Sequence, residues 1–91
     1  MIKTYAEFMD AIERNYKRFS LVPTDLLNDA GVEIYHLYRR LSWDIAFCDN
    51  PKEMLEIIDS DDSHTLYATR RARSELRMIR RCLQKMITKE N

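Results

Sequence analysis

Residues 70–86 read RRARSELRMIRRCLQKM, and this stretch decides the fold class. Its apolar side chains recur at three- and four-residue steps, the spacing that places them on one face of an α-helix. We expect a helix over residues 63–88, capped by Ser63 or Asp62 and about 38 Å long. The side chains predicted to face the core are Ala68, Ala72, Leu76, Ile79, Leu83 and Met86.

The N-terminal part of the chain has the same periodicity. Thr4 and Glu7 form a capping box, in which the threonine hydroxyl accepts from the amide of Glu7 while the glutamate reaches back toward the cap. The helix that follows is predicted over residues 5–19. We expect a peripheral helix with one face to bury, made by Tyr5, Phe8, Met9, Ile12, Tyr16 and Phe19.

A second long helix is predicted over residues 25–48, with Thr24 or Asp25 as its cap. Gly31 lies early in this helix, where it would kink the helix, allow close packing or split off a short first turn. The side chains predicted to face the core are Leu27, Ala30, Ile34, Leu37, Leu41, Ile45 and Cys48.

A short helix over residues 51–58 connects the two long ones, because Asn-Pro at residues 50–51 supplies an N-cap and a first helical residue. One glycine and two prolines leave few places to turn, and no run alternates with the period of a strand. The predicted fold class is all-α, a single domain over residues 1–91. It is a small bundle in which the helices 25–48 and 63–88 pack antiparallel and the 5–19 helix lies across them.

Several features bear on the compartment. No segment approaches the roughly 18 apolar residues that span a bilayer, and the first residues have no apolar signal-peptide core. We therefore expect a cytoplasmic protein without a membrane partner. Cys48 and Cys82 are too few for a disulfide framework, so we expect two thiols that pack as small buried or half-buried apolar groups.

No sequence motif points to catalysis or to a cofactor. The acidic run from Asp59 begins like a calcium loop, but His64 stands where that loop needs glycine and Arg70 where it needs glutamate. The histidines and cysteines lack the spacing of a zinc site, and a single glycine excludes a phosphate-binding loop. No catalytic residue, metal or cofactor is predicted. The enzymatic alternative is a constellation that the fold would assemble from His36, His64, Cys48 or Cys82.

Charge is divided unevenly along the chain, although the net charge is zero. Residues 1–69 hold 7 basic and 13 acidic side chains, and residues 70–91 hold 8 basic and 2 acidic ones. At about 100° per residue, most arginines of the last helix lie opposite its core-facing side. Either they form a solvated face that pairs with acidic helices, or they bind an anionic partner, for which the planar guanidinium is suited. We call this set the arginine face: Arg70, Arg73, Arg77, Arg80 and Arg81.

The second long helix has apolar side chains on two sides. Trp43 and Phe47 are neighbours at i and i+4, and they share the side away from the core with His36 and Arg40. One explanation is that the 5–19 helix covers this side. The alternative is a homodimer or partner interface, in which Trp and Arg are frequent binding hot spots. Three tyrosines are expected at the boundary, with packed rings and hydrated hydroxyls: Tyr35, Tyr38 and Tyr67.

Together these features predict a non-enzymatic interaction or regulatory protein. It would bind a partner protein stoichiometrically and self-associate, as an accessory inhibitor of a phage or mobile element does. The alternative is a nucleic-acid or nucleotide-binding protein that uses the arginine face. Zero net charge argues against non-specific duplex binding, and the last helix lacks interleaved aromatic residues for stacking on single strands.

Overall fold

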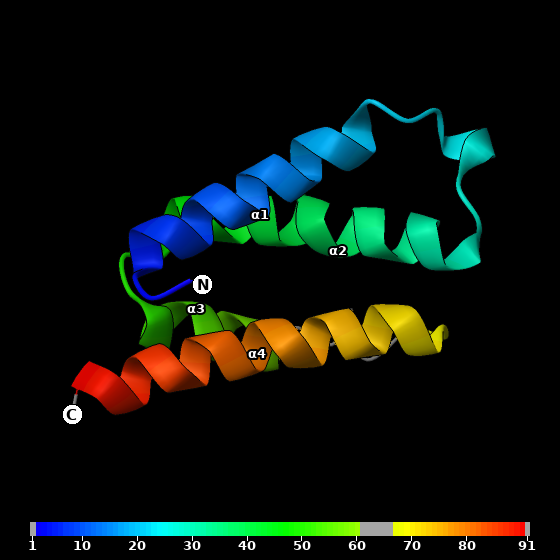
Figure 1. The fold of residues 1–91 in the computed structure, drawn as a ribbon. Coiled ribbons are helices and arrows are strands. Elements are labelled where there is room, and N and C mark those ends of the chain that lie inside the picture. The colour runs from blue at the N-terminus through cyan, green and yellow to red at the C-terminus, as the bar shows by residue number, and fades with distance from the viewer. Residues whose placement is uncertain (1, 61–66, 91) are drawn as a thin grey trace.

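Four α-helices make up most of the described chain (Figure 1). The computed structural model describes residues 2–60 and 67–90, apart from the side chains of Thr24 and Glu90. No strand occurs within these residues, which confirms the predicted all-α bundle. In order along the chain, the elements are α1 (Tyr5–Ser20), a 3-10 turn η1 (Thr24–Leu26), α2 (Asp29–Asp44), a 3-10 turn η2 (Ile45–Phe47), α3 (Pro51–Ser60) and α4 (Arg70–Glu90).

Two helices begin where the sequence predicts. The hydroxyl of Thr4 accepts from the amide of Glu7 at 3.2 Å, so Thr4 is the N-cap of α1. The carboxylate of Glu7 reaches back as expected, but it accepts from the Thr4 hydroxyl at 3.1 Å instead of the Thr4 amide. Ahead of α3, the side-chain oxygen of Asn50 accepts from the amide of Glu53 at 2.9 Å. The carboxylate of Glu53 in turn accepts from the amide of Asp49 at 3.0 Å. Local side-chain chemistry is therefore sufficient to start both helices.

The prediction that the second helix starts at residue 25 is wrong. The chain makes only the turn η1 there, and α2 begins at Asp29 with Asn28 as its N-cap. The side-chain oxygen of Asn28 accepts from the amide of Gly31 at 2.8 Å. A Cβ on Gly31 would lie 3.3 Å from that oxygen, so the glycine leaves room for the cap. At its other end, α2 tightens into η2, which keeps Ile45 and Cys48 in the core.

The last helix also starts later than predicted. Residues 67–69 are not helical, α4 begins at Arg70, and Ala68 is exposed instead of core-facing. The proposed caps Ser63 and Asp62, and most of the acidic run, lie outside the described residues. Thr69 is the local N-cap, because its hydroxyl accepts from the amide of Ala72 at 3.3 Å. The carboxylate of Glu33 accepts from the amides of Ala68 and Thr69, each at 2.8 Å, and so holds the residues just before α4 against α2.

Successive helices run in opposite directions, so α2 and α4 run the same way (Figure 1). Glu33, early in α2, bonds to Thr69 just before α4, and the hydroxyl of Tyr38 further along α2 donates to Glu75 in α4. The predicted antiparallel pairing of these two helices is therefore wrong. The ten-residue α3 runs opposite to both α2 and α4, so the chain reverses direction twice between those two helices.

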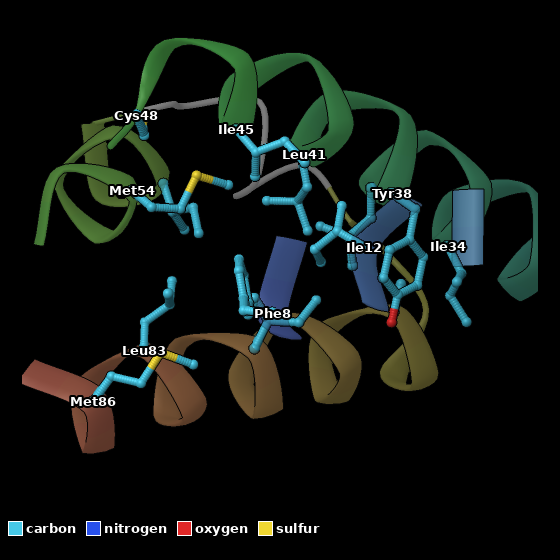
Figure 2. Packing of buried hydrophobic residues seen from close by; sticks show 14 residues of the cluster. Phe8, Ile12, Ile34, Tyr38, Leu41, Ile45, Cys48, Met54, Leu83 and Met86 are labelled. Atoms are coloured by element: carbon cyan, nitrogen blue, oxygen red, sulfur yellow. The ribbon is translucent and has the colours of Figure 1, made fainter. Parts of the chain in front are cut away.

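One core is shared by all four helices, and Figure 2 shows their apolar side chains pointing into a common interior. The largest side chains that are fully enclosed are those of Leu37, Leu41, Met54 and Leu83. The predicted core faces are confirmed apart from Ala68, which is exposed, and Leu27 and Ala30, which are only half-buried and do not belong to the core cluster. α1 is more than a peripheral cover, because Phe8 and Ile12 are buried and the hydroxyl of Tyr5 donates to the carbonyl of Cys48 at 3.2 Å.

None of the described helices combines the length and the apolar character needed to cross a bilayer.

Candidate interaction surfaces

An aromatic pair, Trp43 at the end of α2 and Phe47 in the turn η2 that follows, lies on the outside of the fold. The side chains of Trp43 and Phe47 are 67% and 68% exposed, and their ring centroids lie 5.8 Å apart. His36 and Arg40 are exposed on the same side of the helix. We call these four residues the aromatic patch. The sequence predicts these four side chains on one side of the helix, and in the structure all four are exposed.

α1 does not cover the aromatic patch, contrary to the first of the two explanations for it. It packs on a different side of α2. There the ring of Tyr16 contacts Tyr35 edge-on, with ring centroids 6.0 Å apart, and Phe19 stacks on Tyr38, with ring centroids 6.3 Å apart. At about 100° per residue, Trp43 lies on the far side of α2 from Leu41 and Ile45. α1 borders the patch only through Tyr16 and leaves Trp43 and Phe47 open to water.

A hollow of about 720 Å³ adjoins the patch. Arg40 forms one part of its wall and is oriented by Asp44, whose carboxylate oxygen lies 3.8 Å from its Nε. Asp44 is buried although acidic, which the periodicity of α2 did not predict. The hollow combines aromatic rings with cationic and hydroxyl groups, and it is lined by Tyr16, His36, Arg39, Arg40, Ser42, Trp43 and Tyr67.

The arginine face is only partly available. Arg70, Arg73, Arg77 and Arg81 are exposed, whereas Arg80 turns toward α3, where its Nε lies 2.8 Å from a carboxylate oxygen of Asp59. Within residues 2–60 and 67–90, no carboxylate forms an ion pair with the four exposed arginines. The predicted five-arginine surface is therefore a four-arginine surface, and the fifth joins two helices of the fold.

A carboxylate outside the predicted sites joins α2 to the start of α4. Glu33 accepts from the hydroxyl of Thr69 at 2.5 Å as well as from two amides. The hydroxyl bond is the largest of the influences that lower the pKa of Glu33 below its ordinary value. The amides of Ala68 and Thr69 and the charge of Arg73 act in the same direction. Glu33 is thus held as an anion at a helix N-terminus.

Three of the four candidate reactive groups, Cys48, Cys82 and His36, lie in the described part of the chain. Burial raises the pKa of the Cys48 and Cys82 thiols, which lowers the fraction of reactive thiolate. Both cysteines are free. His36 lies at the surface of α2, and His64 is outside the described residues. No group of three potential metal-ligating side chains is found in the described part of the chain.

A groove that the sequence did not predict lies between α1 and α4. It measures about 900 Å³, with the buried side chains of Phe8, Ile12 and Ile79 in its wall. Met78 of α4 also lines it and is 56% exposed, so the groove has an apolar side chain open to water. A signal was available, because Met78 and Cys82 are apolar, spaced four apart and outside the predicted core-facing set.

Comparison of the chain with known protein families, with curated proteins and with solved structures gave no match.

Proposed function

We propose that this protein is a non-enzymatic interaction protein that binds a partner protein stoichiometrically through the aromatic patch and also self-associates. The observation that carries the proposal is the exposure of Trp43 and Phe47, two large rings in contact with each other and two-thirds open to water. Exposed aromatic residues next to an arginine have the composition of a binding hot spot. The proposal also places the protein in the cytoplasm, where its two free thiols would persist.

The surroundings of the aromatic patch favour it as the binding surface over other exposed apolar residues. Leu21 and Leu26 are 84% and 74% exposed, but they lie in the connection between α1 and α2. Trp43 instead lies beside a hollow with cationic and hydroxyl groups, into which a partner side chain would fit. Rigid helical backbone positions both rings, which lowers the entropy lost on binding.

The test measures association with and without the patch. The wild type and the double variant Trp43→Ala/Phe47→Ala are compared by light scattering across a concentration series and by capture of partners at moderate salt. Leu21→Ala is the control, since it removes an equally exposed apolar side chain elsewhere. We expect the double variant to lose both self-association and partner capture. A wild type that stays monomeric, with capture equal in all three proteins, would contradict the proposal.

The second candidate function is binding of an anionic ligand or nucleic acid by the arginine face. It is favoured by four exposed arginines on one helix, Arg80 being excluded by its pairing with Asp59. Such binding would weaken steeply with salt, with a slope of about 0.9 per phosphate neutralised on duplex DNA. The variant Arg70→Ala/Arg77→Ala should reduce that slope. Affinity for a labelled oligonucleotide that is independent of salt, or unchanged in the variant, excludes this function.

A further inference from the structure

The groove between α1 and α4 has an apolar interior and a cationic edge. Its charged lining residues are four cations and one carboxylate, namely Lys3, Arg81, Lys85, Lys89 and Glu75. The carboxylate of Glu75 accepts the hydroxyl of Tyr38, so it is already engaged within the fold. An occupant of this groove therefore has to offer apolar side chains to the interior and negative charge to the edge.

The cations of α4 form a regular row. Arg81, Lys85 and Lys89 follow one another at steps of four residues, which places neighbours about 6 Å apart along the helix axis. A single carboxylate or phosphate group can pair with only one or two of them. A helix with acidic side chains at the same four-residue spacing can meet all three, since i and i+4 side chains lie on one face.

The groove is also long enough for a helix. From Glu75 to Lys89 its wall follows α4 for about 21 Å, which is the length of a helix of roughly 14 residues. Figure 1 shows α1 and α4 running in opposite directions along the two sides. Met78 is exposed near the Glu75 end of this wall, and a flexible thioether adapts readily to the side chains that a partner inserts.

From this geometry we propose that the groove between α1 and α4 binds an acidic amphipathic helix of a partner protein. Apolar side chains at i, i+3, i+4 and i+7 of that helix pack onto the groove, and flanking carboxylates pair with Lys85 and Lys89. The groove shares no lining residue with the hollow beside Trp43. It is thus a second docking site, independent of the aromatic patch.

The test uses a synthetic amphipathic peptide of about 14 residues, with leucines on one face and glutamates beside them at four-residue spacing. A second peptide carries lysine in place of each glutamate. Fluorescence anisotropy measures binding of both to the wild type and to Lys85→Glu/Lys89→Glu. The variant Arg70→Glu/Arg77→Glu is the matched control, because it makes the same charge change on exposed residues of α4 that do not line the groove.

We expect the wild type to bind the glutamate peptide roughly tenfold tighter than the lysine peptide, and Lys85→Glu/Lys89→Glu to reverse that preference. The control pair should change the affinity by no more than about threefold. Trp43→Ala/Phe47→Ala should bind the glutamate peptide like the wild type, so the outcome here is separate from that of the proposed function.

Three results would overturn the proposal. The first is equal binding of both peptides, and the second is affinity that Lys85→Glu/Lys89→Glu leaves unchanged. The third is occupation of the groove by something else. A fatty acid in the groove would be indicated if dodecanoate displaced the peptide at a concentration lower than that of the peptide. A second copy in the groove would be indicated by a homodimer that only Lys85→Glu/Lys89→Glu dissociates.

Discussion

Glu33 of α2 holds Thr69, the N-cap of α4, by accepting from both its amide and its hydroxyl, at 2.8 and 2.5 Å. The same hydroxyl accepts from the amide of Ala72 at 3.3 Å, so one threonine links the carboxylate to the first turn of the helix. The positive end of the helix dipole at this N-terminus favours an anion nearby. The support that Glu33 gives to the cap is tertiary, since 36 residues separate it from Thr69.

The first prediction concerns the acid sensitivity of this cap. The pKa of Glu33 is lower in the folded protein than its ordinary value of 4.5, chiefly through the Thr69 hydroxyl. The unfolded chain therefore binds more protons at acidic pH, and the free energy of unfolding falls as pH drops through that window. Glu33→Gln should be less stable at neutral pH and should lose less stability on acidification. Urea unfolding at a series of pH values measures both effects.

Glu56→Gln is the control for that experiment, because Glu56 is an exposed glutamate on α3. It should follow the wild type across the whole series. If Glu33→Gln also follows the wild type, the carboxylate does not hold Thr69 in solution.

The second prediction separates Arg80 from the other arginines. Arg80 and Asp59 are 40% and 47% exposed at their side chains, so water and salt screen the pair. A double-mutant cycle with Arg80→Ala and Asp59→Ala should give a coupling energy of about 0.5 kcal/mol, which disappears at high salt. The same cycle with Arg77→Ala in place of Arg80→Ala should give no coupling. Equal coupling in the two cycles would mean that the pair is not formed.

The third prediction concerns Tyr38, whose hydroxyl is buried and donates to Glu75. Tyr38→Phe should cost about 1 kcal/mol of stability at neutral pH, the net contribution of one hydrogen bond. Burial raises the pKa of Tyr38 above its ordinary value of 10.0, and the bond to Glu75 adds to the effect. Above that pH the unfolded chain releases a proton that the folded protein retains, so wild-type stability falls as pH rises.

Phenylalanine cannot ionise, so the stability gap between Tyr38→Phe and the wild type should narrow on alkalinisation. Urea unfolding at neutral pH and at about pH 11 tests this. Tyr5→Phe offers an independent check with the same sign, because burial and nearby negative groups raise the pKa of Tyr5 to about 12. A gap that widens with pH would contradict the assignment.

The fourth prediction uses Trp43 as a reporter, since it is the one tryptophan of the chain. Its side chain is 67% exposed, so acrylamide should quench its fluorescence in dilute folded protein almost as efficiently as in urea. Raising the protein concentration should reduce the quenching if a second copy covers the aromatic patch. Strong protection in dilute solution would show that Trp43 is not at the surface.

Sequence periodicity predicted the helices and nearly all of the core, because the burial of one helix face repeats along the chain at a fixed spacing. It predicted caps well where one candidate stood alone, as Thr4 does before α1. Before α2 the candidates compete. Thr24, Asp25 and Asn28 are all good cap residues, and only the packed structure shows that Asn28 begins the helix.

The errors concern contacts between distant segments. Tyr38 was expected to have a hydrated hydroxyl, yet it is buried because Glu75 from another helix accepts that hydroxyl. Glu33 of α2 holds the segment just before α4, and the direction of α4 depends on α3, which reverses the chain. The groove depends on how α1 and α4 are placed relative to each other. No local pattern encodes these relationships.

The reversal of the chain direction at α3 also has a consequence for folding kinetics. It divides the chain into two helical hairpins, α1 with α2 and α3 with α4. Each hairpin joins neighbouring segments, so closing the loop between its helices costs little entropy. The hairpins are then joined through α2 and α4, where Glu33 and Tyr38 make their bonds. We expect these bonds to form after the rate-limiting step. Glu33→Gln should then speed unfolding and leave the folding rate nearly unchanged, which the two arms of a chevron plot would distinguish.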